Sequence, residues 1–156
     1  MRAAPHAPAL ELLSCPVCAD DTALAPGSAG QALVCARNHS FDIARQGYVS
    51  LLAGAANARG DTAAMLADRD AFQQAGHFLP IAAAVAAAAT ATAHSDSARV
   101  ADVGAGTGYY LAQVLDALPD STGVAVDVAK AAARRAAGAH PRALAVVADA
   151  WRGLPL

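Results

Sequence analysis

From residue 99 onward the sequence alternates between short apolar runs and longer helical runs, and this alternation constrains the fold most. The runs RVADV (99–103), TGVAVDV (122–128) and RALAVVADA (142–150) are rich in valine and alanine and have the length of buried strands. The segments between them, residues 107–118 and 129–139, have the length and composition of helices. Strands and helices that alternate over short connections form a parallel sheet. The pattern predicts an α/β fold of the doubly wound kind, truncated after its third strand. Its last strands would expose an apolar edge unless another segment covers it.

The part of the chain before this pattern divides into two further regions. The first holds all three cysteines and short β-like runs, and the second reads as a loop followed by two helices. Asp61 lies where an N-cap is expected, and Gly76 lies where a C′ glycine ends the first of these helices. Pro80 suits the first turn of the second helix. The expected segments are 1–50, 51–97 and 98–156.

The turn after the first predicted strand contains three glycines at alternate positions. Glycines here let a ligand approach backbone N–H groups closely. A dinucleotide fingerprint, G-x-G-x-x-G, requires glycine where Tyr109 stands, and no Gly-Lys-Ser/Thr follows as in a P-loop. The spacing resembles the first motif of class I S-adenosylmethionine-dependent methyltransferases, while NAD binding and a purely structural turn stay open as alternatives. The predicted cofactor-binding residues of this motif are Asp102, Gly104, Ala105, Gly106, Thr107, Gly108, Tyr109 and Tyr110.

Two further acids close the next two predicted strands. Asp127 follows GVAV and Asp149 follows VVA, and the carboxyl ends of parallel strands meet at the edge where open α/β sheets bind ligands. We expect Asp127 to accept both ribose hydroxyls of the cofactor, with Val128 next to it. We expect Asp149 to accept the adenine amino group, with Ala150 and Trp151 beside the ring. The alternative for Asp127 is an N-cap of the following helix.

The cysteines have the spacing of a metal site. Cys15, Cys18, Cys35 and His39 form the pattern C-x2-C-x16-C-x3-H. Two ligand pairs on separate hairpin turns can close a tetrahedron, and soft thiolates with an imidazole favour zinc. All four positions are filled, so we expect a structural zinc (Zn2+) site. A redox C-x-x-C is the alternative, although such a motif should open a helix, and proline and loop residues surround this one.

Composition narrows the function classes. The formal net charge is −2, so the chain has no overall basic character that would mark a polyanion-binding protein. Residues 1–14 lack the pattern of a signal peptide, and residues 81–93 are too short and too weakly apolar to span a bilayer. Three cysteines in this pattern fit a reducing compartment. We therefore expect a cytoplasmic protein that does not contact a membrane.

Several strings of residues together resemble one family, the bacterial 23S ribosomal RNA (guanine-N1)-methyltransferases. The strings are CPVC, HSFDIARQGYVSLL, GDTAAML, AGHF, DVGAGTGYY and DVAKAAARRAA. The resemblance implies a zinc module that helps to grip RNA, joined to a class I methyltransferase domain that binds S-adenosyl-L-methionine. It also implies that Phe78, where tyrosine is usual, covers the cofactor. Asp70 departs from the family, which tends to have a second arginine beside Arg69.

The resemblance also implies partners and a reaction. The substrate would be a hairpin of 23S ribosomal RNA, the family suggests a homodimer, and one branch is associated with tylosin-type macrolide resistance. No catalytic residue is assigned, because no side chain in this sequence is a convincing general base. A non-catalytic zinc- and cofactor-binding fragment and a small-molecule class I methyltransferase remain the alternatives. The candidate phosphate contacts are Arg37, Arg45, Arg59 and Arg69.

Overall fold

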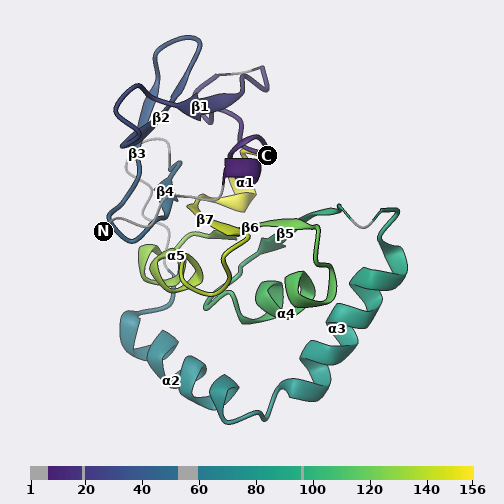
Figure 1. Ribbon diagram of the computed structural model, residues 1–156. Coiled ribbons are helices and arrows are strands. Elements are labelled where there is room, and N and C mark those ends of the chain that lie inside the picture. Colours follow the sequence, from purple (N-terminus) through teal and green to yellow (C-terminus); the bar gives the residue numbers. More distant parts are fainter. Residues whose placement is uncertain (1–6, 19, 53–59, 96) are drawn as a thin grey trace.

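The computed structural model describes residues 7–18, 20–52, 60–95 and 97–156, and Figure 1 shows its elements. Within these residues there are two sheets: a three-stranded antiparallel sheet in the order β1-β2-β3, and a four-stranded sheet in the order β4-β7-β6-β5. In chain order the elements are α1 (Ala7–Leu10), β1 (Leu24–Pro26), β2 (Ala32–Cys35), β3 (Ser40–Asp42), β4 (Val49–Ser50), α2 (Ala63–Gln74), α3 (Leu79–Thr92), β5 (Arg99–Val103), α4 (Tyr109–Ala117), β6 (Thr122–Asp127), α5 (Lys130–Ala136), β7 (Ala143–Val147) and a 3-10 turn η1 (Ala150–Arg152).

The four-stranded sheet confirms the predicted α/β class. β5, β6 and β7 run parallel, and α4 and α5 form the crossovers between them. Asp102 is paired in register with Ala125, and Asp127 with Val147, so the carboxyl ends of the three strands lie at the same edge. This arrangement follows from the alternation of strand and helix in the sequence.

The structure shows which segment covers the last strand of this sheet. The sequence predicts an apolar edge at the last strands unless another segment covers it, and β4 is that segment: it pairs in parallel with β7, with Val49 opposite Val146. All five residues of β7 are buried. Within the described residues the terminal strands of the sheet are β4 and β5, and Val103 of β5 is half exposed. The two-residue strand β4 is too short to show a periodic pattern, which is why the sequence did not reveal it.

The two faces of the sheet carry side chains of different size. Val126 and Val146 belong to one hydrophobic cluster with α1 and the antiparallel sheet. Ala125 and Ala145 face the other way, toward leucines of α4 and alanines of α5. Figure 1 shows α1 on one side of the sheet and α4 and α5 on the other. Period-2 alternation thus directs large residues toward the N-terminal region, while small residues let the helices approach the sheet closely.

The N-terminal region from residue 13 to 50, which we call the ribbon, shares a core with the sheet. Leu13, Leu24 and Leu33 of the ribbon are buried in the same cluster as Val126 of β6. The backbone N–H of Ser14 also donates to the carbonyl of Pro155, 3.0 Å away. The predicted division at residue 50 stays a prediction, and apolar packing continues across it.

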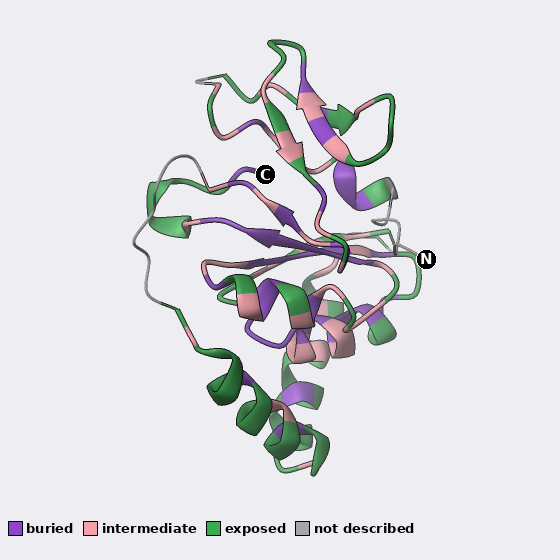
Figure 2. Ribbon diagram, turned by 90° about the vertical axis from the view of Figure 1, so that its left-hand side faces the viewer, coloured by how far each residue is buried: buried purple, intermediate pink, exposed green. Residues whose placement is uncertain are grey.

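Helices α2 and α3 form an outer arm beneath α4 and α5 (Figure 1). Figure 2 shows that most of this arm is exposed, whereas the central strands are buried. Thr62, not Asp61 as expected, is the N-cap of α2, because its hydroxyl accepts from the N–H of Met65 at 3.3 Å. Gly76 follows the C-cap with φ +83°, as predicted for a C′ glycine.

Length and hydropathy decide whether a helix is a candidate to cross a membrane. Among the described residues, no single helix has both the length and the hydropathy required. Taken together, α2 and α3 meet the length and composition criteria, but the pair is bent by 86°.

Candidate metal centre and cofactor site

The four predicted metal ligands converge at one end of the ribbon. Cys15 and Cys18 lie on the turn before β1, while Cys35 ends β2 and His39 precedes β3. Their ligand atoms all lie within 4.8 Å of one another. The antiparallel pairing of β1, β2 and β3 brings the two turns together, with Leu24 opposite Cys35.

The distances within this cluster match a tetrahedral zinc site. The Nδ1 atom of His39 lies 3.5 Å from the sulfur of Cys15 and 3.4 Å from those of Cys18 and Cys35. The sulfurs of Cys18 and Cys35 are 3.9 Å apart. Bonds of about 2.3 Å to sulfur and about 2.0 Å to nitrogen would space the ligands of a tetrahedron by about 3.5–3.8 Å. The donor set and its spacing therefore fit zinc, with no ligand position left for a substrate.

The backbone around Cys35 favours its thiolate. Burial opposes ionisation, but hydrogen bonds from the backbone N–H groups of His39 and Arg37, with contacts from the neighbouring thiols, lower the pKa of Cys35 to about 7. Burial and the hydrogen bond with Cys15 instead raise the pKa of Cys18. A thiolate at Cys35 is the form that a metal ion requires.

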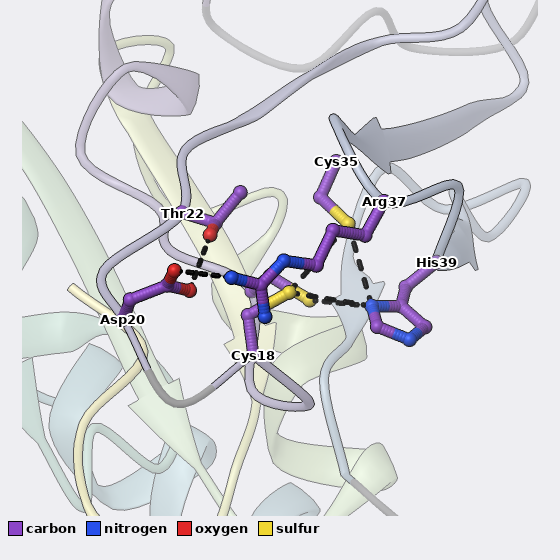
Figure 3. A network of polar contacts seen from close by, with 7 residues as sticks. Cys18, Asp20, Thr22, Cys35, Arg37 and His39 are labelled. Carbon is purple, nitrogen blue, oxygen red and sulfur yellow. Dashed lines mark hydrogen bonds and ion pairs between the residues drawn. The ribbon is translucent and has the colours of Figure 1, made fainter.

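A polar network lies beside the cluster (Figure 3). The guanidinium of Arg37 pairs with the carboxylate of Asp20, which also accepts a hydrogen bond from the hydroxyl of Thr22 at 2.6 Å. The hydrogen bond from Thr22, with the charge of Arg37, lowers the pKa of Asp20. Of the other predicted phosphate contacts, Arg45 is exposed, and Arg59 lies outside the described residues.

A second candidate site is a hollow of about 910 Å³ at the carboxyl edge of the parallel sheet. The volume is in the range of small-molecule sites. The hollow lies where the carboxyl ends of β5, β6 and β7 meet, as the alternating pattern of the sequence predicts. Of the thirteen predicted cofactor-binding residues, five line it, namely Gly104, Asp127, Val128, Asp149 and Ala150.

Asp127 connects the glycine loop to the start of α5. One carboxylate oxygen accepts from the N–H of Gly106 at 2.9 Å, and the other accepts from the N–H of Ala129 at 2.8 Å. The N-cap of α5 is Ala129, so the alternative that Asp127 caps this helix is wrong. Each carboxylate oxygen of Asp127 can still accept a further hydrogen bond from a ligand.

Asp149 has a similar local role at the end of β7. Its carboxylate accepts from the N–H of Trp151 at 3.1 Å and lies 3.6 Å from Nε of Arg152. Trp151 is 99% exposed and lines the hollow. An exposed aromatic ring beside a carboxylate suits a planar base that has an amino group.

Asp102 lies behind the glycine loop, outside the lining of the hollow. Burial is the main cause of the raised pKa of Asp102. A hydrogen bond from the backbone of Leu111 lowers this pKa, and the negative charge of Asp127 raises it further. One of its carboxylate oxygens is buried and has no hydrogen-bond partner among the described residues. A buried, unpaired acceptor carries a cost in stability, which is common at functional sites.

The glycines of the loop have different surroundings. At Gly104, with φ +78°, a Cβ would meet nothing within 4 Å, so the backbone is open toward the hollow. At Gly108, with φ +79°, a Cβ would lie 2.9 Å from Cβ of Ala139 and 3.1 Å from Cα of Ala136. The first glycine therefore leaves space for a ligand, whereas the third permits α4 to start against α5.

The other predicted residues of the glycine motif do not line the hollow. Ala105 is buried. Thr107 is also buried, and its hydroxyl donates to the side chain of Gln73 at 2.7 Å. The rings of Tyr109 and Tyr110 meet edge to face, with centroids 5.3 Å apart. These residues join the loop to α2 and α4 rather than form the wall of the hollow, and their cofactor role stays a prediction.

Phe78 lies on the turn between α2 and α3. Its ring packs edge to face against Phe72 of α2, with centroids 5.2 Å apart, and it is outside the lining of the hollow. The cofactor-covering role that the resemblance implies for Phe78 therefore stays a prediction.

Two residues of the hollow differ in position from what the sequence predicts. The sequence predicts a phosphate contact at Arg69 and an N-cap at Asp61, yet the two side chains form an ion pair of 2.8 Å in the wall of the hollow. Asp70 stands where the resembling family tends to have a second arginine. Its negative charge is balanced here, because its carboxylate pairs with the guanidinium of Arg135 of α5 at 2.7 Å. The sequence placed Arg69 on a helix but did not show which face of that helix meets the loop.

Comparisons with known proteins agree with the motifs. A family model described as RlmA, N-terminal, a zinc ribbon, matches residues 13–55. A protein of Micromonospora griseorubida, named as a 23S rRNA (guanine-N(1)-)-methyltransferase, is 49% identical over 97% of this chain and 56% of its own length. The 23S rRNA (guanine(748)-N(1))-methyltransferase of Streptomyces fradiae is 44% identical over 92% of this chain and 50% of its own length.

A solved structure also aligns with part of the chain. It is that of CalO1, a methyltransferase in calicheamicin biosynthesis, in its SAH-bound form. The identity is 33% over 57% of this chain and 28% of CalO1, with a TM-score of 0.42. The named relatives and the ribbon match confirm the family resemblance, and the chain spans about half the length of the curated relatives it matches.

Proposed function

We propose that this chain carries the zinc ribbon and the cofactor-binding part of an S-adenosylmethionine-dependent methyltransferase that acts on guanine N1 of 23S ribosomal RNA. The observation that carries this proposal is the hollow in which Gly104, Asp127 and Asp149 converge. The names of the relatives supply the substrate class.

The residues of the hollow fit the proposed cofactor. Acceptors at Asp127 and Asp149 suit ribose hydroxyls and an adenine amino group, and the space at Gly104 lets the ligand approach the backbone. When bound, the cofactor supplies an activated methyl group on a sulfonium. The protein then has mainly to hold this donor and the guanine in line, so positioning is its chief contribution.

We propose that the ribbon is the region that binds the RNA. Arg45 is exposed, and Arg37 lies half exposed beside the metal cluster with a surface ion pair to Asp20. Exposed ion pairs exchange readily for phosphate contacts because they contribute little to stability. The target guanine must leave its stack to present N1, so the ribbon would hold the RNA while the base enters.

Calorimetry and methyl transfer test this function together. The zinc-loaded chain is titrated with S-adenosylhomocysteine, and labelled S-adenosylmethionine is then offered with a 23S rRNA hairpin. We expect saturable binding and a methyl group at guanine N1, which is detected as a stop in reverse transcription. Binding without transfer would favour the non-catalytic alternative, and absence of binding would refute the cofactor assignment.

Finer features of this function are also proposals. A homodimer is supported by exposed apolar residues on the arm, including Phe72, Leu79 and Ile81, and analytical ultracentrifugation tests it. The tylosin-type resistance of one branch of the family supports a role in macrolide resistance, tested by inhibitory concentrations in a sensitive host. Cysteines arranged as metal ligands support a cytoplasmic location, tested by fractionation.

A further inference from the structure

The position of Arg69 in the wall of the hollow suggests a role for its positive charge. Arg69 is the only basic residue among the described residues that line the hollow. One of its terminal nitrogens lies 3.2 Å from the point where a Cβ of Gly106 would be. The guanidinium therefore covers the middle of the glycine loop, and its ion pair with Asp61 holds it there.

The order of strands shows which part of the proposed cofactor would reach Arg69. Along the sheet the order is β7, β6, β5, so Asp149, Asp127 and the glycine loop follow one another across the hollow. With adenine at Asp149 and ribose at Asp127, the remaining amino-acid end extends toward the loop. Arg69 lies at that end of the hollow, against the loop.

The charges of the hollow point to the same end. Asp61, Asp127 and Asp149 bring three carboxylates to the lining, against the single guanidinium of Arg69. S-adenosylmethionine has two positive groups, the sulfonium and the ammonium, and one negative group, the α-carboxylate. An arginine fork matches a carboxylate in shape and charge. Within the described part of the chain, Arg69 is thus the one cationic partner that the lining offers to that negative group.

Helix α2 is fixed where it presents Arg69. Leu66, about one turn earlier, is fully buried against Ala129 and Ala132 at the start of α5. Gln73, about one turn later, is nearly fully buried and accepts from the hydroxyl of Thr107 in the loop. Contacts on both sides limit the movement of α2, so the arginine is held in position before a ligand binds.

We propose that Arg69 binds the α-carboxylate of the cofactor's amino-acid end and thereby selects ligands that have an amino-acid group. This inference rests on the proposed function, because it takes S-adenosylmethionine as the ligand. It takes the place of the sequence-based prediction that Arg69 contacts RNA phosphate.

Two ligands that differ at the amino-acid end test the inference. The zinc-loaded chain and its Arg69→Met variant are titrated with S-adenosylhomocysteine and with 5′-methylthioadenosine, which lacks the carboxylate. We expect the variant to lose about 10- to 100-fold in affinity for the first ligand and to keep its affinity for the second. Arg69→Lys, which keeps the charge without the fork, should lose less.

The control is Arg134→Met, a change to an exposed arginine of α5 that does not line the hollow. Zinc content and the thermal midpoint confirm that each variant is folded. Equal losses for both ligands, or no loss for either, would overturn the role of Arg69 while leaving the proposed function intact. If the unaltered chain binds neither ligand, the proposed function fails, and the inference fails with it.

Discussion

The metal centre and the hollow are built in opposite ways. The four metal ligands come from one short antiparallel unit, and they already stand at the spacing of a zinc tetrahedron. The hollow instead draws its lining from separated regions: α2 with the residues before it, and the ends of β5, β6 and β7. Two of its acids, Asp127 and Asp149, are engaged mainly with backbone N–H groups.

Because the two sites are built differently, substitutions at the metal centre and in the hollow should affect different properties, namely stability and ligand affinity. Loss of one metal ligand should affect folding, because the ribbon has little other than the metal and its shared core to hold it. Changes in the hollow should affect ligand affinity first, since its residues lie mostly at loops and strand ends. Variants that lower either the stability or the ligand affinity, but not both, would support this difference between the two sites.

The largest effect is expected from Cys35→Ser. A tetrahedral site that lacks one thiolate should release its zinc, and the free energy of unfolding should fall by about 3 kcal/mol or more. Metal analysis and thermal unfolding measure the two effects. Because Leu33 and Val126 share a core, amides of β6 should also lose protection from hydrogen exchange. Ser28→Ala, at an exposed ribbon position, is the control, and retention of one zinc by Cys35→Ser would contradict the prediction.

Asp127→Ala should have the next largest effect, on affinity. The change removes the predicted acceptor for ribose and also frees the N–H groups of Gly106 and Ala129, so affinity for S-adenosylhomocysteine should fall by about 100-fold or more. Calorimetry measures the affinity, while zinc content should not change. Asp127→Asn, which keeps one carbonyl acceptor, serves as the matched variant. Unchanged affinity in both variants would remove Asp127 from the site.

A pair of glycine substitutions sharpens the comparison within one loop. Gly108→Ala should lower the free energy of unfolding by about 2 kcal/mol, because it combines a left-handed backbone with close contacts to α5. Gly104→Ala should lower the free energy of unfolding by about 1 kcal/mol, because only the left-handed backbone opposes the new side chain. It should also reduce cofactor affinity, because the new Cβ enters the hollow. Chemical denaturation and calorimetry report the two effects. Equal stability losses would show that the packing argument is wrong.

The smallest effect is expected from Asp102→Asn. The raised pKa of Asp102 means that the folded state holds a proton more tightly than the unfolded chain. Stability is therefore lost as pH rises from the ordinary pKa of 3.8 through the higher folded pKa, and the loss persists above it. At neutral pH the variant should be more stable by up to about 1 kcal/mol, with the gap narrowing as pH falls. Chemical denaturation at several pH values measures the gap, and a gap that widens on acidification would contradict this assignment.

The parts of the molecule that the sequence predicted well are those encoded by spacing. Strand–helix alternation determines the parallel order of β5, β6 and β7, since short connections allow few topologies. The metal cluster could be predicted because the type and spacing of its residues satisfy one coordination geometry. Both patterns depend on residues close together in the chain.

The parts that the sequence did not predict depend on contacts between distant segments. Pairing of Val49 with Val146 joins two strands from opposite parts of the chain, and nothing local indicates it. The packing role of Gly108 depends on where α5 ends, and the place of Arg69 depends on the face that α2 turns toward the loop. Phe78 was assigned by resemblance, and its packing against α2 could not be read from a motif.

The core shared by the ribbon and the sheet has a consequence for biosynthesis. The metal ligands leave the ribosome before the strands β5, β6 and β7 and can bind their ion while translation continues. The apolar underside of the ribbon, however, stays uncovered until β6 and β7 have emerged, because those later strands provide its packing partners. The nascent chain therefore exposes this hydrophobic surface while α2 to α5 are being synthesised. A chaperone that covers the surface would protect the nascent protein from aggregation.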